Sequence, residues 1–116
     1  MKIIIAGSRD ITDFDIICKA IITSNAKEKI TELVSGTARG VDALGEKWAE
    51  IYHIPIKKFP ANWNKYGKSA GYRRNEEMSE YGDALLAIWD GSSKGTQHMI
   101  DIAKEKGLKV YVYKVS

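Results

Sequence analysis

The sequence has 116 residues, of which 44% are hydrophobic and 28% charged, and its formal net charge is +3. This length has room for one hydrophobic core, so we expect a single domain over residues 1–116. The longest apolar run, Ala84–Trp89, is far too short to span a bilayer, and a strand-like run begins directly after Met1. We therefore expect a cytoplasmic protein with no membrane partner. A lone cysteine, Cys18, excludes an internal disulfide.

Apolar runs alternate with segments of helical periodicity along the chain. Strands are predicted at Lys2–Ala6, Glu32–Ser35, Ile54–Phe59, Ala84–Trp89 and Lys109–Tyr113. Helices are predicted after a cap at Thr12 or Asp13, over Val41–Tyr52, over Tyr72–Tyr81 and over Gly95–Lys106, with a long loop at Pro60–Ser69. In the second helix, Val41, Leu44, Trp48 and Ile51 are spaced to face a sheet.

Five strands alternating with helices predict an α/β fold, a Rossmann-like three-layer sandwich with a five-stranded, mainly parallel sheet. The consecutive isoleucines after Lys2 and the run Ala84–Trp89 indicate burial on both faces, so these strands are expected at the centre of the sheet. Ligands of such folds bind beyond the carboxyl ends of the strands, where the strand order reverses. The loops after these two strands should face each other there.

The first candidate loop is Gly7-Ser8-Arg9-Asp10. Gly7 permits a sharp turn off the strand, Ser8 and the backbone N–H groups suit a phosphate, and Arg9 could clamp one bidentately. A tight turn in which Arg9 pairs with Asp10 or Asp13 is the alternative interpretation.

The second candidate loop is Ser35-Gly36-Thr37-Ala38-Arg39-Gly40-Val41-Asp42, which precedes a helix N-terminus that favours anions. Asp42 is expected either to accept N–H bonds from the first turn of its own helix or to orient Arg39. The loop lacks the G-x-G-x-x-G pattern, and no acidic residue ends the second strand to hold a ribose. An NAD-type redox role is therefore not expected, nor is any other cofactor. Helix capping and close packing explain the same residues without a ligand.

The third candidate loop is Gly71-Tyr72-Arg73-Arg74-Asn75 at the start of a helix. Adjacent helical residues point about 100° apart, so at most one arginine should face the crevice. Arg74 with Asn75 is a candidate clamp for a phosphate and a hydroxyl, and Arg74 is the candidate catalytic residue if the protein is an enzyme. Solvated arginines on an exposed helix face are the alternative.

The fourth candidate loop is Asp90-Gly91-Ser92-Ser93-Lys94-Gly95-Thr96. Its small residues allow close backbone approach to a phosphate, but Lys94 precedes the glycine, so this is not a Walker P-loop. Trp63 and Tyr72 are candidates for stacking on a base, and a lid or dimer contact would use the same residues. His53 and His98 stand alone in the sequence, so no metal site is expected.

The predicted binding residues gather in these four loops. They are Gly7, Ser8, Arg9, Ser35, Gly36, Thr37, Arg39, Gly40, Asp42, Arg74, Asn75, Asp90, Gly91, Ser92, Gly95 and Thr96. We expect phosphates on the Gly7, Gly36 and Gly91 loops.

Together the loops resemble the SLOG superfamily, which includes DprA (Smf) and the Lonely-guy phosphoribohydrolases, and they are most similar to its small YspA-like members of bacteria and phages. Residues 35–42 are similar to the S-G-x-A-x-G-[IV]-D signature of the DprA branch, and Arg74-Asn75 matches the pair that follows it. Arg74 with Met78 is similar to the R-x-x-x-M stretch of the Lonely-guy branch, and Asp90–Thr96 occupies the place of its P-G-G-x-G-T loop. The resemblance implies a Rossmann-like sheet that binds nucleotides or their derivatives, often in homo-oligomers.

One departure decides between functions. The phosphoribohydrolases continue G-T-x-x-E with a catalytic glutamate, whereas Met99 stands at that position here, with Asp90 and Glu77 as conceivable substitutes. The leading hypothesis is therefore a binding module that senses or sequesters a nucleotide or nucleotide-derived molecule. A nucleoside 5′-monophosphate phosphoribohydrolase is the enzyme alternative. DprA-like binding of single-stranded DNA is a third, which the small net charge disfavours.

Overall fold

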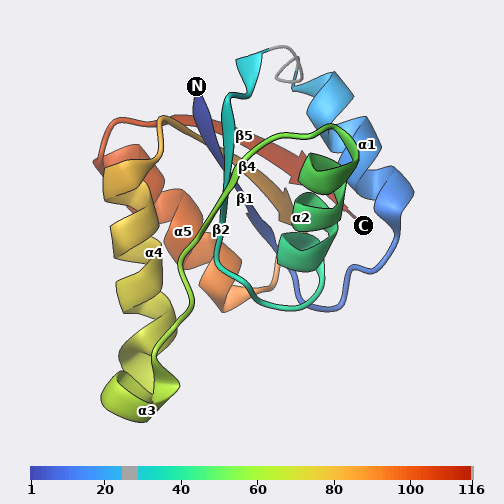
Figure 1. The fold of residues 1–116 in the computed structure, drawn as a ribbon. Helices are drawn as coiled ribbons and strands as arrows, with labels where there is room; N and C mark the ends of the chain where they lie inside the picture. Colours follow the sequence, from blue (N-terminus) through green and yellow to red (C-terminus); the bar gives the residue numbers. More distant parts are fainter. Residues whose placement is uncertain (25–28, 116) are drawn as a thin grey trace.

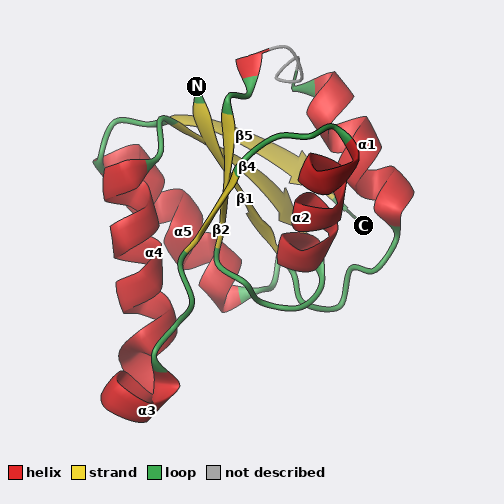
Figure 2. Ribbon diagram, in the orientation of Figure 1, coloured by secondary structure: helices red, strands yellow, loops and turns green. Residues whose placement is uncertain are grey.

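The computed structural model describes residues 1–24 and 29–115. Its centre is a five-stranded parallel sheet in the order β3-β2-β1-β4-β5 (Figures 1 and 2). The strands are β1 (Lys2–Gly7), β2 (Glu32–Ser35), β3 (Ile56–Lys58), β4 (Ala84–Trp89) and β5 (Lys109–Lys114). The predicted Rossmann-like α/β fold is confirmed.

Helices cover both faces of the sheet and make three layers (Figure 1). The helices are α1 (Phe14–Thr23), α2 (Val41–Ile51), α3 (Trp63–Tyr66), α4 (Ala70–Tyr81) and α5 (Lys94–Glu105). Helices α1 and α2 pack on one face, and α4 and α5 pack on the other. A short 3-10 turn, η2 (Gly67–Ser69), joins α3 to α4.

The consecutive isoleucines of β1 explain why both faces are covered. Because side chains alternate along a strand, Ile3 and Ile5 pack with α1 and α2, while Ile4 packs with α4 and α5. All three are buried. Strand β1 therefore lies between β2 and β4 and holds the two halves of the core together.

Three local expectations were wrong. The segment expected as a loop at Pro60–Ser69 contains α3 and η2, because the Asn62 side chain accepts a hydrogen bond from the Lys65 N–H at 3.1 Å and caps a helical turn. Helix α4 consequently begins at Ala70 rather than Tyr72. Ile51 does not face the sheet: it lies at the end of α2 and is 52% exposed.

The chain switches sides of the sheet between β1 and β4. It runs outward from β1 through β2 to β3, and then returns to β4 and β5 on the other side. Gly7 pairs with Ile88 at the carboxyl end of this junction, and the Ser8 N–H donates to the Ile88 carbonyl at 3.3 Å. The loops after β1 and β4 therefore meet at the position where ligands of this fold class bind.

Gly7→Ala should destabilise the protein by about 3 kcal/mol, since an added Cβ would overlap the Ile88 carbonyl and lie 2.8 Å from a Val41 methyl group. Gly95→Ala is the control, because no described atom lies within 4 Å of an added Cβ there. Its free energy of unfolding should change by less than about 1 kcal/mol. Urea unfolding followed by circular dichroism measures both, and equal effects would contradict the packing described at Gly7.

Candidate functional site

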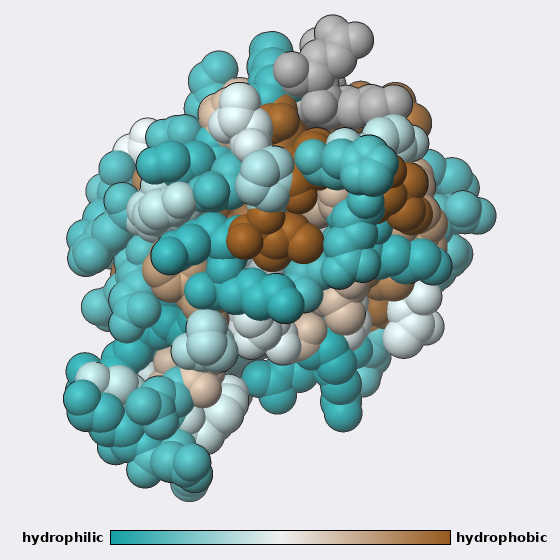
Figure 3. Space-filling view, viewed as in Figure 1, coloured by the Kyte–Doolittle hydropathy of each residue, from teal (hydrophilic) through white to brown (hydrophobic). Residues whose placement is uncertain are grey.

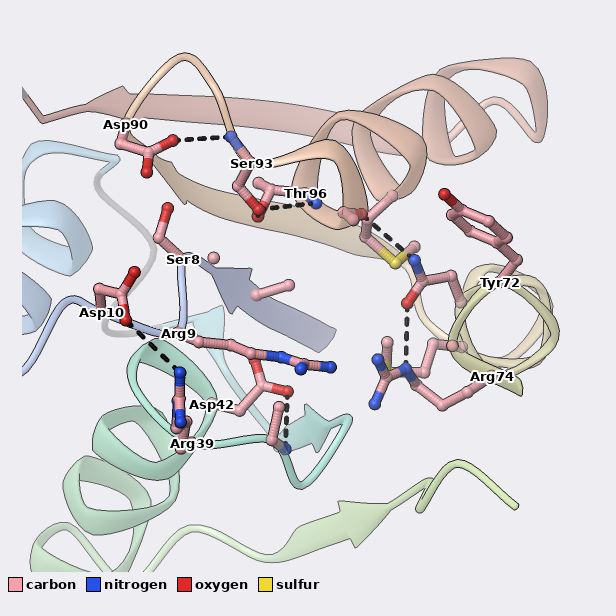
Figure 4. Close-up of a pocket in the computed structure, with 18 of the residues that line it drawn as sticks. Ser8, Arg9, Asp10, Arg39, Asp42, Tyr72, Arg74, Asp90, Ser93 and Thr96 are labelled. Carbon is pink, nitrogen blue, oxygen red and sulfur yellow. Dashed lines mark hydrogen bonds and ion pairs between the residues drawn. The ribbon is translucent and has the colours of Figure 1, made fainter. Parts of the chain in front are cut away.

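A cavity of about 510 Å³ opens at the carboxyl ends of β1 and β4 (Figure 4). Loops after β1, β2 and β4 form its walls together with the first turns of α4 and α5. The predicted binding residues that line it are Gly7, Ser8, Arg9, Arg39, Asp42, Trp63, Tyr72, Arg74, Asn75, Asp90, Ser92, Gly95 and Thr96. Three loops and helix α4, which are distant from one another in the sequence, thus contribute to one concave surface.

A second cavity of about 510 Å³ adjoins the first. Gly36 and Thr37 line it with Pro60 and Ala61, and the two cavities share Arg9, Ala38, Arg39, Trp63 and Arg74. Ser35, Gly40 and Gly91 line neither of these two cavities among the described residues. Their roles are structural.

Arg74 is fixed by one contact with the loop after β2 and one with its neighbour on α4. Its Nη1 donates to the Gly36 carbonyl at 2.5 Å, and its Nε donates to Asn75 Oδ1 at 3.1 Å. Desolvation lowers the pKa of Arg74 from its ordinary value, and Asp42 opposes that effect. The guanidinium groups of Arg74 and Arg9 face each other across the cavity (Figure 4).

The neighbouring Arg73 points elsewhere, as the helical geometry requires. Its Nε donates to the Ser69 hydroxyl at 3.2 Å, and its guanidinium lies 4.3 Å from the centroid of the Tyr66 ring. The prediction that at most one of the two arginines faces the crevice is confirmed, because Arg74 lines the cavity and Arg73 does not among the described residues.

Asp42 lies buried behind the arginines, and its predicted partners were wrong. Its Oδ2 accepts a hydrogen bond from the Ala38 N–H at 3.2 Å, four residues earlier, rather than from its own helical turn. Arg39 is not oriented by Asp42: it forms an exposed ion pair with Asp10, with 3.6 Å between Nη2 and Oδ1. Burial raises the pKa of Asp42 to about 6, although Arg74 and Arg9 act in the opposite direction.

Gly36 and Gly40 bring the second loop close to its neighbours. A Cβ on Gly36 would lie 2.7 Å from Arg74 Nη1 and 2.8 Å from Asp42 Oδ2, so only glycine leaves room for both groups. Gly40 has a φ of 73° and lies against the backbone of Ser8 and Arg9. These glycines shape the site without contributing side chains.

Ser35 is a structural residue of the same loop. Its hydroxyl donates to Glu46 Oε2 at 2.6 Å and accepts from the Thr37 N–H at 3.1 Å. The hydroxyl therefore fixes the turn after β2 rather than facing either cavity.

The fourth loop is organised by its own side chains. Asp90 Oδ1 accepts hydrogen bonds from the N–H groups of Ser92 at 2.8 Å and Ser93 at 2.9 Å. The Ser93 hydroxyl caps α5 by accepting from the Thr96 N–H at 3.4 Å. Gly91 has a φ of 87°, which allows the tight turn between them.

The two candidate stacking residues are available at the rim. Trp63 is 49% exposed and Tyr72 is 45% exposed. The Arg9 guanidinium lies 5.9 Å from the Trp63 ring centroid, and Tyr72 packs on the His98 ring with 4.5 Å between centroids. Figure 3 shows the end that carries α3 as a mainly hydrophilic lobe projecting from the body of the molecule.

Asn75 connects α4 to α5 at the cavity wall. Its Nδ2 donates to the Gly95 carbonyl at 3.3 Å and lies 3.1 Å from His98 Nδ1. Since its Oδ1 accepts from Arg74, the Asn75 amide holds the arginine by one end and α5 by the other.

Further lining residues were absent from the predicted set. They are Ala6, Asp10, Ala38, Pro60, Ala61, Lys68, Gly71, Met78, Ser93 and Met99. Four of these residues lie inside the predicted loops, so the sequence pattern of the loops could have identified them as cavity-lining residues: Asp10, Ala38, Gly71 and Ser93. No sequence pattern marked Pro60, Ala61 and Lys68 as cavity-lining residues, because tertiary packing sets the path of the segment before α4.

Residues 1–24 and 29–115 hold neither a metal-binding cluster nor a membrane-crossing helix. No cluster of three or more His, Cys, Asp or Glu side chains there is placed to hold a metal ion. No helix there has the length and apolar character that crossing a membrane requires.

Asp42→Asn should change the pH dependence of stability. Because the folded protein binds the Asp42 proton up to about pH 6 rather than the ordinary 3.8, Asp42 opposes folding increasingly as the pH rises through this window. The stability of the variant relative to wild type should therefore increase by about 3 kcal/mol across it. Urea unfolding at a series of pH values measures the difference, with Asp101→Asn on α5 controlling for the change in net charge. A difference that does not vary with pH would contradict the burial of an ionisable Asp42.

The comparisons with known proteins agree with this geometry. The model of the YspA, cpYpsA-related SLOG family (YAcAr) matches residues 1–66, which include the first two loops of the site. The chain is also 37% identical over 84 residues to the Gene 61 protein of Mycobacterium phage D29, and the matched segment covers 67% of each chain. This chain belongs to the YspA, cpYpsA-related SLOG family.

Proposed function

We propose that this protein binds a nucleotide or a nucleotide-derived small molecule and acts as a sensor or sequestering module for it. The observation that carries the proposal is the convergence of Arg9 and Arg74 on one cavity (Figure 4). The cavity volume of about 510 Å³ lies within the range of small-molecule sites, roughly 300–1,000 Å³. Family membership supports a nucleotide-related role.

The phosphate of the ligand would lie between the two arginines. Guanidinium groups bind phosphate oxygens through paired N–H donors, and the bonds from Arg74 to Gly36 and Asn75 reduce the conformational entropy lost on binding. Asp42 offsets part of this positive charge when it is ionised, but burial raises its pKa to about 6, so the carboxyl is only partly ionised near that pH. The anion site therefore keeps a net positive character.

A base would stack on Trp63 or Tyr72. Both rings line the cavity and are about half exposed, so a planar ligand can cover them at little cost in protein rearrangement. Stacking energy differs little between bases, and these two rings alone do not choose among them.

The phosphoribohydrolase alternative lacks support at the reacting end of the cavity. Met99 lines the cavity and has no carboxylate to stabilise an oxocarbenium-like transition state. Glu77 is exposed and lies outside the cavity lining among the described residues. Asp90 does line the cavity, but its Oδ1 is engaged by the Ser92 and Ser93 N–H groups. Binding is therefore favoured over cleavage of the N-glycosidic bond.

Arg74→Ala should weaken nucleotide binding by more than about tenfold, since a charge-assisted pair of hydrogen bonds is lost. Arg73→Ala is the matched control, because it removes an equal charge from the adjacent position of α4 but outside the cavity. Isothermal titration calorimetry with nucleoside mono-, di- and triphosphates measures both, after thermal unfolding has shown that each variant folds. Equal affinities for wild type and Arg74→Ala would contradict the proposal.

Incubation with nucleoside 5′-monophosphates should release no free base, because Met99 replaces the carboxylate that this cleavage uses. Chromatography of the reaction mixture at times up to a day, against a mixture without protein, is the measurement. Accumulation of adenine, guanine, cytosine or uracil above that control would instead favour the hydrolase.

A further inference from the structure

The Ser8 hydroxyl is buried and makes no hydrogen bond of good geometry among the described residues, although the Asp90 carboxylate lies near it. Ser8 is 3% exposed and lines the cavity, yet its Oγ makes no hydrogen bond among the described residues. It points toward the Asp90 side of the cavity (Figure 4). Because an unsatisfied buried hydroxyl is destabilising, a ligand group that bonds to the Ser8 hydroxyl would relieve this cost.

Asp90 is solvent-exposed and lines the same cavity, so a ligand can reach its carboxylate. Its Oδ1 is engaged by the N–H groups of Ser92 and Ser93, whereas no well-formed hydrogen bond reaches its Oδ2 among the described residues. The pKa of Asp90 is lowered, chiefly by the Ser92 and Ser93 N–H groups, with smaller contributions from the nearby hydroxyls of Ser8 and Ser92. Asp90 is thus an ionised carboxylate that can only accept hydrogen bonds.

This end of the cavity is unsuited to phosphate. An ionised carboxylate repels a phosphate, and Asp90 already occupies the Ser92 and Ser93 N–H groups that a phosphate would use. Arg9 and Arg74 lie on the other side of the same cavity (Figure 4). We therefore do not expect the Gly91 loop to bind phosphate. The cavity instead suits a ligand that is anionic near Arg9 and Arg74 and carries hydrogen-bond donors near Asp90.

We propose that Ser8 and Asp90 bind the hydroxyl groups of a ribose, so that the protein selects ribonucleotides over 2′-deoxyribonucleotides. A ribose hydroxyl donates to Asp90 Oδ2 and accepts from Ser8 Oγ, which satisfies both unused groups. Ser8 and Arg9 both line this cavity, so one ligand can contact the Ser8 hydroxyl with its sugar and the Arg9 guanidinium with its phosphate. This inference rests on the proposed function and adds the class of sugar.

Ribose fits this position better than the edge of a base. The walls beside Ser8 and Asp90 are made by small residues, Gly7, Ser92 and Thr96, which offer no flat surface for a ring. Tyr72 lies on the opposite side, next to Arg74 (Figure 4). The experiment distinguishes a contact between Asp90 and an amino group of the base from a contact between Asp90 and the ribose.

The experiment titrates the protein with AMP, GMP, CMP and UMP and with their 2′-deoxy counterparts by calorimetry. Wild type should bind its preferred ribonucleotide about tenfold more tightly than the matching 2′-deoxynucleotide. Asp90→Asn keeps an oxygen for the Ser92 and Ser93 N–H groups but turns an N–H donor toward the ligand, so this preference should disappear while affinity for the deoxynucleotide is kept. Ser8→Ala should reduce the preference, and Asp101→Asn should leave it unchanged.

Each other result overturns a defined part of the account. Equal affinity of wild type for ribo- and deoxynucleotides, with binding intact, overturns the ribose contact and leaves the proposed function standing. A preference among bases that changes in Asp90→Asn, with the ribose preference unchanged, assigns Asp90 to the base instead. Absence of binding to every nucleotide overturns the proposed function and this inference together.

Discussion

The site depends on a carboxylate and a guanidinium that both lie close to one glycine, Gly36. Asp42 and Arg74 come from different helices, and both approach Gly36 so closely that a methyl group would displace one of them. Burial disfavours the charged form of both side chains, since it raises the pKa of Asp42 and lowers the pKa of Arg74. Proteins keep such strained electrostatics mainly where a ligand uses them. A phosphate facing Arg74 and Arg9 would restore the charge balance that the fold leaves incomplete.

The fold could be predicted from the sequence because its strongest signals are local. Consecutive isoleucines require a strand covered on both faces, and Ala84–Trp89 requires another beside it. The prediction failed where tertiary contacts override periodicity. Asn62 caps a helical turn inside an apparent loop. Ile51 is the last residue of its helix and is exposed to solvent instead of packing on the sheet.

The site could be predicted as a set of loops but not as a set of contacts. Loops that follow parallel strands converge, so Arg9 after β1 and Asp90 after β4 lie in one cavity as expected, and helix α4 brings Arg74 to the same cavity. Side-chain pairing is different: the sequence could not show that Asp42 lies near Arg74 while Arg39 turns outward to Asp10. Nor could it show that Asp90 Oδ1 accepts hydrogen bonds from the Ser92 and Ser93 N–H groups.

Native mass spectrometry of the protein purified from cells tests the central claim most directly, because it needs no guess about the ligand. The account predicts a bound compound that contains phosphorus and absorbs as a nucleobase on wild type, and its loss from the folded Arg74→Ala protein. Wild type that carries no such compound, or a compound retained equally by both proteins, would contradict it.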